Sequence, residues 1–191
     1  IYLGLRFWGR SVGYYTPDQI MSDDYSSQRY APMLASNHSI ANLAKGLKSG
    51  GIKADDRKLV RALGASVIRF LYMGGKTTTE GYPLDAVIFD EVRRMLEGDI
   101  ERAEERVAHA DYPVILKLST AKYPGTTISR YFDAGTQEVF HSTCRCPDGV
   151  ALAWKFPESI GIVGDDIFWR CPTCDTRIVR PADGRFVART P

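Results

Sequence analysis

The sequence predicts a three-layer α/β domain built on a parallel sheet, followed by a small cysteine-bearing unit. Short continuous apolar runs, typical of strands covered on both faces, alternate with stretches of helical periodicity, and this alternation indicates parallel strands joined by helices. The pattern changes at Val139 to short aromatic-bearing runs, and all four cysteines lie between residues 144 and 174. We therefore place the α/β domain at residues 1–138 and the second unit at residues 139–191.

Composition places the chain among ordinary globular proteins. Its 191 residues are 44% hydrophobic and 25% charged, which excludes the fibrous and disordered classes. The formal net charge of +2 at pH 7 is too close to neutrality for a polycation, so any contact with nucleic acid must come from local patches. No apolar run reaches the roughly 18 residues that a membrane span requires, and we expect a soluble protein without a membrane partner.

The first half of the chain shows alternating helix and strand signals. Runs of β-branched and aromatic residues predict strands, whereas apolar residues at three- and four-residue spacing predict helices. The segment 59–63 fits neither pattern clearly. Tyr14 and Tyr15 are expected to be core residues. The predicted elements are the end of a helix at residues 1–8, a buried strand at 12–15, one or two helices between 18 and 47, a strand at 66–73 and an exposed loop at 74–81.

The second half continues the alternation. Residues 86–89 form a short continuous apolar run, which predicts a strand covered on both faces. Apolar side chains from Val92 to Val107 recur at three- and four-residue steps, so we predict one amphipathic helix there. Residues 114–118 predict another buried strand, and a polar loop follows it.

Two acidic residues directly follow the strand predicted at residues 86–89. Asp90 and Glu91 come after four apolar residues and before a predicted helix. The acidic half of a P-loop nucleotide site has this order. Asp90 can hold Mg²⁺ or its water shell, and Glu91 can polarise a water that faces the γ-phosphate. The alternative interpretation is an acidic pair that caps the next helix.

Two hydroxyl residues follow the next predicted strand. Ser119 and Thr120 come directly after residues 114–118, where a parallel neighbour would present small hydroxyl side chains beside the same phosphates. In motor ATPases the corresponding loop senses the γ-phosphate. The alternative interpretation is a turn at the strand end that the two hydroxyl groups stabilise.

The four cysteines form two close pairs that predict a structural zinc ribbon in a reducing compartment. Cys171 and Cys174 are separated by two residues, a spacing that lets both sulfurs bind one zinc ion. Cys144 and Cys146 are separated by one residue, which is tighter and less usual, and His141 can replace one of them. Four protein ligands would close the coordination sphere, so the metal would be structural. Reduced thiols without metal are the alternative.

Taken in this order, the motifs resemble the ATPase domain of tailed-phage terminase large subunits, particularly the lambda-like group with a cysteine-bearing insert. Together they cover most of the chain, although only the Walker B and cysteine elements are specific by themselves. The matching segments are Ser11-Val-Gly-Tyr-Tyr-Thr-Pro17 for the strand after the P-loop helix, Leu84-Asp-Ala-Val-Ile-Phe-Asp-Glu91 for Walker B, Leu116-Lys-Leu-Ser-Thr120 for the coupling motif, and Cys144 to Cys174 followed by Asp183-Gly-Arg-Phe for the insert.

The resemblance implies a P-loop NTPase-type sheet and an ATPase that uses ATP, Mg²⁺ and structural Zn²⁺. Glu91 and Asp90 would be catalytic, Asp90 would also hold Mg²⁺, and Ser119 and Thr120 would couple phosphate sensing to the grip on DNA. In this family the ATPase is a ring motor that drives double-stranded DNA into a preformed capsid. The implied partners are double-stranded DNA, the terminase small subunit, the portal or procapsid and further copies of the chain in a homo-oligomeric ring. The implied location is the cytoplasm of the infected bacterial host.

Two departures from the family pattern affect these expectations. No G-x-x-x-x-G-K-[ST] run occurs, and Gly74-Gly-Lys-Thr77 follows a strand but opens no convincing helix. We expect the phosphate loop to precede Ile1, so that this stretch alone binds ATP weakly and hydrolyses little or none. The single-residue spacer between Cys144 and Cys146 is the second departure, and it leaves the zinc ligand set open.

Two other functions are compatible with the sequence. A superfamily 2 helicase shares the Asp-Glu pair and a similar hydroxyl motif, and it would separate strands, whereas terminases translocate on duplex DNA. A non-catalytic zinc-ribbon module would instead recognise nucleic acid or a protein partner, with the α/β part as a scaffold. A local basic stretch would then contact phosphates, although such runs more often form a solvated face. It consists of Lys45, Lys48, Lys53, Arg57, Lys58 and Arg61.

Overall fold

The computed structural model describes residues 10–38, 59–63, 66–74, 82–144, 152–153 and 156–189. The chain divides into two compact units, Ile1–Ser129 and Arg130–Pro191. The helix predicted at residues 1–8 and most of the loop predicted at 74–81 lie outside the described residues.

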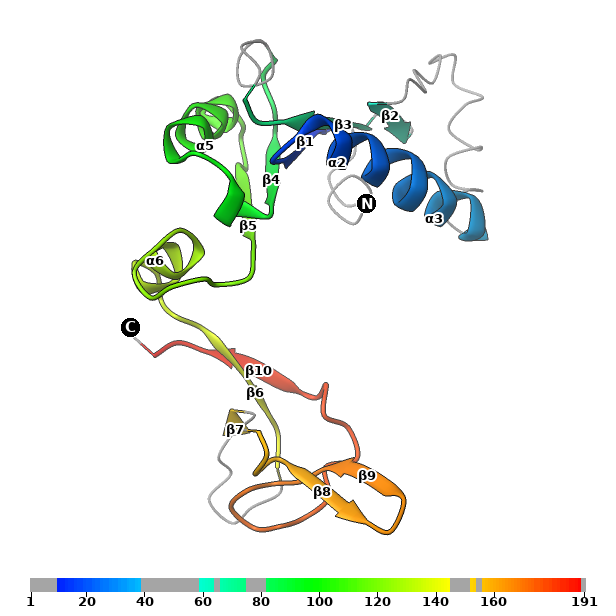
Figure 1. Ribbon diagram of the computed structural model, residues 1–191, viewed down its shortest axis with the longest axis vertical. Coiled ribbons are helices and arrows are strands. Elements are labelled where there is room, and N and C mark those ends of the chain that lie inside the picture. The colour runs from blue at the N-terminus through cyan, green and yellow to red at the C-terminus, as the bar shows by residue number, and fades with distance from the viewer. Residues whose placement is uncertain are drawn as a thin grey trace. The chain divides into compact units, whose positions relative to one another are not determined.

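The first unit is built on one sheet, whose strands are β1 (Ser11–Thr16), β2 (Val60–Leu63), β3 (Ser66–Tyr72), β4 (Ala86–Asp90) and β5 (Val114–Leu118). Their order is β2-β3-β1-β4-β5 (Figure 1). β1, β3, β4 and β5 are parallel, which confirms the predicted direction for these strands, whereas β2 pairs antiparallel with β3 and makes the sheet mixed. The prediction of an all-parallel sheet is therefore wrong at β2. Only two residues separate β2 from β3, and so short a connection joins antiparallel strands.

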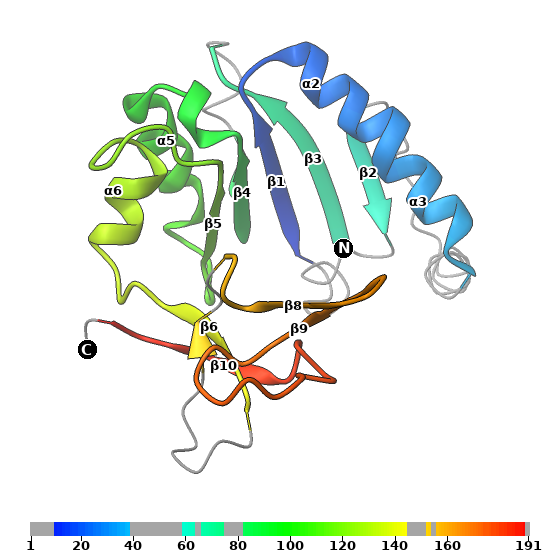
Figure 2. The same ribbon diagram turned by 60° about the horizontal axis from the view of Figure 1, so that its bottom comes forward.

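One face of the sheet is covered by a continuous helical segment. It consists of α2 (Gln19–Asp24), a π-helical stretch (Tyr25–Tyr30) and α3 (Ala31–Ser36), and Figure 2 shows it beside β3. Tyr25, Tyr30 and Leu34 pack against apolar strand residues. The helix prediction for residues 18–47 is confirmed as far as Ser36, and residues 39–47 lie outside the described part. The strand residues of this cluster are Val12, Tyr14, Ile68, Phe70 and Ala86.

The opposite face is covered by α5 (Glu97–Glu104) and by the 3₁₀ turn that follows it (Glu105–Val107). Successive strand residues point to opposite faces, so Tyr15 and Phe89 turn away from the cluster on the first face, and their rings stack with centroids 5.3 Å apart. Arg106 donates hydrogen bonds to the Tyr15 hydroxyl and, at 2.7 Å, to the Tyr82 carbonyl. Helices therefore lie on both faces of the sheet.

The single helix predicted from Val92 to Val107 is wrong. A 3₁₀ turn (Val92–Arg94) precedes α5, and Met95 and Leu96 between them have extended backbone with ψ angles of 153° and 135°. The Leu96 carbonyl then accepts the first amide bonds of α5, from Asp99 at 3.1 Å and Ile100 at 3.2 Å. Periodicity identified most of the buried positions, but it cannot detect a break that restarts the helix at a new angle.

The strand predicted at residues 114–118 forms as β5, but its predicted burial is wrong. Ile115, Leu116 and Leu118 are 46%, 41% and 41% exposed. In the sheet as described, β5 has β4 on one side and no second neighbour. An outer strand is less covered on both faces than an inner one, which explains the exposure of these apolar side chains.

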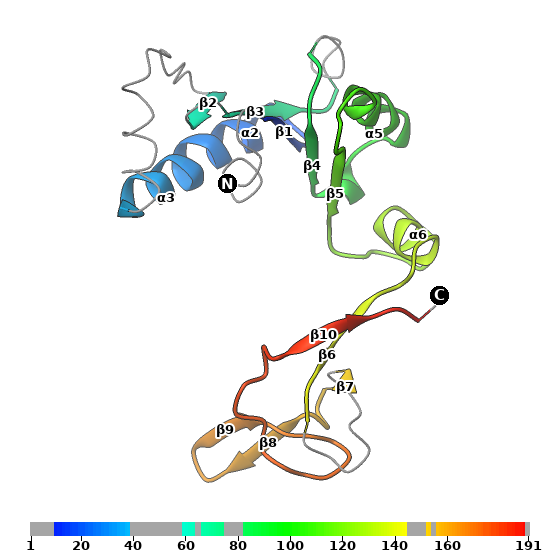
Figure 3. The same ribbon diagram turned by 180° about the vertical axis from the view of Figure 1, so that it is seen from behind.

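The second unit contains short strands, as expected after Val139. A three-stranded antiparallel sheet has the order β10-β6-β7, and β8 and β9 form a separate hairpin (Figure 3). α6 (Ile128–Asp133) spans the boundary between the units. No helix in the described ranges is long and apolar enough to cross a membrane. The strands are β6 (Val139–Ser142), β7 (Leu152–Ala153), β8 (Ile160–Val163), β9 (Asp166–Trp169) and β10 (Gly184–Val187).

Ile100→Ala is expected to lower the free energy of unfolding by about 2–5 kcal/mol, because Ile100 is only 1% exposed and its loss leaves a cavity beside the sheet. Leu96→Ala removes a side chain of similar size that is 73% exposed, and should change stability by no more than about 0.5 kcal/mol. Urea denaturation of the two variants measures the difference. Equal losses would contradict the packing of α5 on the sheet.

Candidate functional site

The parallel pairing of β4 and β5 brings the predicted site residues to one edge of the sheet. Asp90 is the last residue of β4, which pairs with β5 along its whole length, and Ser119 and Thr120 follow the end of β5. The Ser119 hydroxyl accepts a 3.1 Å hydrogen bond from the backbone amide of Arg93, two residues after Glu91. The two carboxylates and the two hydroxyl residues thus belong to adjacent loops at the carboxyl ends of neighbouring strands.

Asp90 is held by a side chain from the other neighbouring strand, β1. The Tyr14 hydroxyl donates a 2.5 Å hydrogen bond to Asp90 Oδ2, and the Tyr14 ring stacks on Tyr25 with centroids 4.5 Å apart. Burial, followed by hydrogen bonds with Asp90 and Tyr25, raises the pKa of Tyr14. The phenol therefore stays protonated at neutral pH and remains a donor to the carboxylate.

Glu91 has a backbone conformation that is rare for residues other than glycine. Its φ of 60° and ψ of 44° lie in the left-handed region. Such a position costs about 1–3 kcal/mol and persists only when the surrounding contacts hold it. The carboxylate is half-buried and forms a 3.0 Å ion pair with Arg93 Nε. Strain of this kind concentrates at functional sites, which makes Glu91 a candidate for more than a capping role.

Three positive side chains lie on the loops that follow β4 and β5. Arg94 forms a 3.0 Å ion pair with Asp18 Oδ2, and Asp18 Oδ1 accepts a 2.9 Å hydrogen bond from the Met21 amide at the start of α2. Arg93, Arg94 and Lys122 line an open pocket of about 260 Å³. A pocket lined by three cationic side chains favours an anionic ligand.

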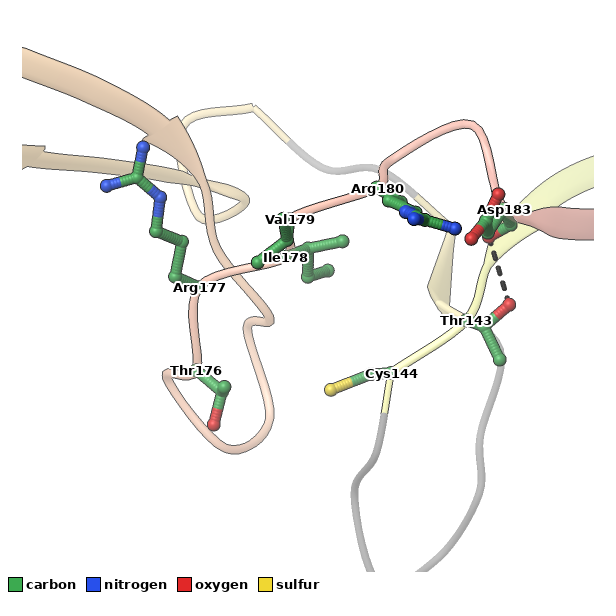
Figure 4. Close-up of a pocket in the computed structure, with 8 residues that line it drawn as sticks. All are labelled: Thr143, Cys144, Thr176, Arg177, Ile178, Val179, Arg180 and Asp183. Atoms are coloured by element: carbon green, nitrogen blue, oxygen red, sulfur yellow. Dashed lines mark hydrogen bonds between the residues drawn. The ribbon is translucent and has the colours of Figure 1, made fainter.

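Three cysteines of the second unit form a compact group. The sulfur atoms of Cys144, Cys171 and Cys174 lie within 4.8 Å of one another, and those of Cys144 and Cys174 are 3.5 Å apart. Two sulfurs bound to one zinc at about 2.3 Å lie about 3.8 Å apart in tetrahedral geometry, so the observed spacing suits zinc. Figure 4 shows the Cys144 side chain directed toward the loop that carries Thr176.

Two backbone amides are directed at the sulfur of Cys171. The amides of Thr173 and Cys174 both donate to Cys171 Sγ, at 3.4 and 3.5 Å. Cys171 is fully buried and forms a small apolar cluster with Cys144 and Ile178. The buried sulfur is thus held in place next to those of Cys144 and Cys174, where all three can act as ligands of one ion.

The two remaining predicted ligands are His141 and Cys146. His141 lies on β6 and is not a member of the cysteine group. Cys146 lies outside the described residues. Among the described residues, the structure therefore brings together three of the predicted ligands, and no histidine belongs to that group.

Sequence reasoning missed the side chains that hold the two carboxylates. The sequence predicts only a core position for Tyr14 and no role for Arg93 or Asp18. The contact between Tyr14 and Asp90 joins residues 76 positions apart, so no local pattern indicates it. The contact could have been predicted only from a strand order that places β1 beside β4.

Most of the basic stretch noted in the sequence lies outside the described residues. Lys45, Lys48, Lys53, Arg57 and Lys58 lie outside the described residues. Arg61 is described, and its Nε donates a 3.2 Å hydrogen bond to the Ser26 hydroxyl. This contact links β2 to the helical segment and is a structural one.

A comparison with protein families identifies a match that covers most of the chain. Residues 10–186 match the family described as phage terminase large subunit gpA, ATPase domain. A search of curated proteins finds no match. The chain therefore belongs to the gpA family of phage terminase large subunits, and the resemblance seen in the sequence is confirmed. The family assigns it an ATPase role.

Asp18→Ala is expected to lower the free energy of unfolding by about 1 kcal/mol, because it removes the side-chain cap of α2. Asp18→Asn should recover most of this loss, since the amide oxygen can still accept from Met21. Arg94→Ala should have an effect of at most about 0.5 kcal/mol, because its ion pair with Asp18 is exposed. Chemical denaturation distinguishes the cap from the ion pair, and equal losses for the Asn and Ala variants would contradict the cap.

Proposed function

We propose that this chain forms part of the ATPase motor of a phage terminase, coupling ATP hydrolysis to translocation of double-stranded DNA into a procapsid. Family membership supports the proposal. The observation that carries it is the meeting of Asp90, Glu91 and Ser119 at the carboxyl edge of adjacent parallel strands. Ligands of open α/β sheets bind at this edge, and a nucleotide there would lie beside both carboxylates.

Asp90 suits the role of the magnesium-holding residue in a P-loop NTPase-type site. Mg²⁺ prefers oxygen ligands and is usually bound through one or two carboxylates together with substrate phosphates. Tyr14 occupies Oδ2 of Asp90, so Oδ1 can face the ion or its water shell. The ion would supply neutralisation of charge on the phosphates.

Glu91 is the proposed residue for orienting and polarising the attacking water. A carboxylate at this position can accept a hydrogen bond from a water that faces the γ-phosphate. The ion pair with Arg93 and the left-handed backbone both restrict where the carboxylate can lie. A fixed carboxylate is more effective than a mobile one, because catalysis of phosphoryl transfer depends mainly on positioning and electrostatics.

Ser119 and Thr120 are the proposed coupling residues. The Ser119 hydroxyl is bonded to the backbone of Arg93, and Arg93 is paired with Glu91. A shift of the loop after β5 on loss of the γ-phosphate would therefore act on the segment that carries Glu91. This short path supports a role in sensing the phosphate.

The second unit is proposed to be a structural zinc ribbon. Cys144, Cys171 and Cys174 are three of its ligands, and Cys146 is the proposed fourth. Four protein ligands would leave no open position for a substrate or a reactive water. The ion would therefore contribute to folding of the unit and not to hydrolysis.

The wider setting of the protein is proposed from its family. A packaging motor requires double-stranded DNA, a portal on the procapsid and a terminase small subunit as partners. We expect several copies of the chain to act as a homo-oligomeric ring in the cytoplasm of the infected bacterial host.

Glu91→Gln in the full-length protein is expected to leave ATP binding largely intact and to lower hydrolysis by about 10²–10⁴-fold, because the amide cannot accept a proton from the water. Nucleotide binding and steady-state phosphate release measure the two effects. Glu101→Gln, at an exposed position of α5, is the matched control and should retain both. Loss of binding with turnover retained would contradict the assignment.

Assays of the full-length protein on DNA distinguish the proposed motor from the two alternative functions. Translocation on duplex DNA without strand separation supports the packaging motor. ATP-dependent strand separation would favour a superfamily 2 helicase, whereas DNA binding that is independent of nucleotide would favour a passive zinc-ribbon module.

Cys171→Ser is expected to reduce the zinc content from about one ion per chain to none, because it removes the buried sulfur ligand of the group. Cys146→Ser should have a similar effect, whereas His141→Ala should retain zinc. Thr173→Ala is the matched control, since Thr173 contributes its backbone amide. Elemental analysis of the purified proteins provides the measurement, and full zinc content in the Cys171 variant would exclude this site.

A further inference from the structure

We propose that Tyr14 is a positioning residue for the nucleotide-bound metal, acting through its hydrogen bond to Asp90. The inference rests on the proposed function, in which Asp90 holds Mg²⁺. It adds a role for a residue on β1, two strands away from β5 and absent from the acidic motif itself.

The geometry of the sheet brings the two side chains together. Tyr14 pairs in register with Ile88 on β4, and side chains two residues apart on a strand share one face. The phenol of Tyr14 therefore extends along the same face as Asp90 and reaches Oδ2 at 2.5 Å. One carboxylate oxygen is occupied by a donor from the protein, which fixes the rotation of the group.

The donor itself is immobilised by packing. Tyr14 is 8% exposed, and its ring lies 4.5 Å from the ring of Tyr25 and 5.7 Å from that of Phe70, measured between centroids. The ring cannot turn without disturbing the aromatic cluster on this face. Its hydroxyl thus holds the carboxylate from a rigid part of the fold, as the outer partners of metal-binding side chains commonly do.

A purely structural role makes a different prediction. In that case the hydrogen bond only satisfies the buried hydroxyl of Tyr14, and its removal would lower stability without changing how the site handles a divalent cation. The two roles are separated by measuring cation binding directly, independently of ATP turnover.

The experiment uses Mn²⁺ as a spectroscopic substitute for Mg²⁺ in the full-length protein with ATP. Electron paramagnetic resonance gives the affinity for Mn²⁺, and competition with Mg²⁺ gives the affinity for the natural ion. Tyr14→Phe keeps the ring and should weaken binding of either ion by about 10-fold. Tyr30→Phe removes another hydroxyl from the same aromatic cluster and should leave the affinity unchanged.

Tyr14→Leu removes the same hydroxyl with a different apolar shape and serves if the Phe variant does not fold. Thermal melting of all variants shows whether folding is intact. Wild-type cation affinity in a folded Tyr14 variant overturns the positioning role.

Asp90→Asn provides the separate test of the proposed function. If Asp90→Asn leaves Mn²⁺ binding unchanged, the metal-holding role of Asp90 fails. If Asp90→Asn weakens it and Tyr14→Phe does not, only the inference about Tyr14 fails.

Discussion

The hydrogen bonding of β4 between β1 and β5 is the constraint on which the candidate site depends. In this parallel register Asp90 lies within reach of Tyr14 on one side and of the loop after β5 on the other. Side chains alternate between faces, so a slip of one residue would turn Asp90 toward α5 and away from Tyr14. The apolar packing on both faces of the sheet resists such a slip. The position of the carboxylate therefore depends on the whole core and not on the acidic motif alone.

The two units obtain their stability from different sources. The first packs aromatic and aliphatic side chains on both faces of its sheet, with Phe70 and Phe89 almost fully buried. The second has a much smaller apolar cluster centred on Cys171, while Trp169 and Phe186 remain 41% and 65% exposed. A small unit buries too little apolar surface to be stable by itself, and a structural metal commonly supplies the difference. The cysteine group has the spacing for that role.

The sequence was most informative where the signal is local. Runs of β-branched and apolar residues predicted the strands at 66–73 and 86–89, and cysteine spacing predicted a cluster that the structure assembles from three of the four cysteines. It failed where neighbours far along the chain decide the outcome, as with the exposure of Ile115 and the break at Leu96. The motif located the two carboxylates at the end of a strand, but their roles stay predictions. The hydrogen bond from Tyr14 to Asp90 can be predicted only when the order of the strands in the sheet is known, and periodicity does not reveal that order.

Glu91 has a left-handed backbone, so its proposed role in hydrolysis would set stability against chemistry at a single position. Glycine adopts these angles without steric penalty, so it would relieve the strain while removing the carboxylate. A packaging protein selected only for heat resistance would be expected to drift to glycine here, whereas one that must hydrolyse ATP would retain the acid. Under the proposed function, the glutamate at this position would support turnover at a cost in stability.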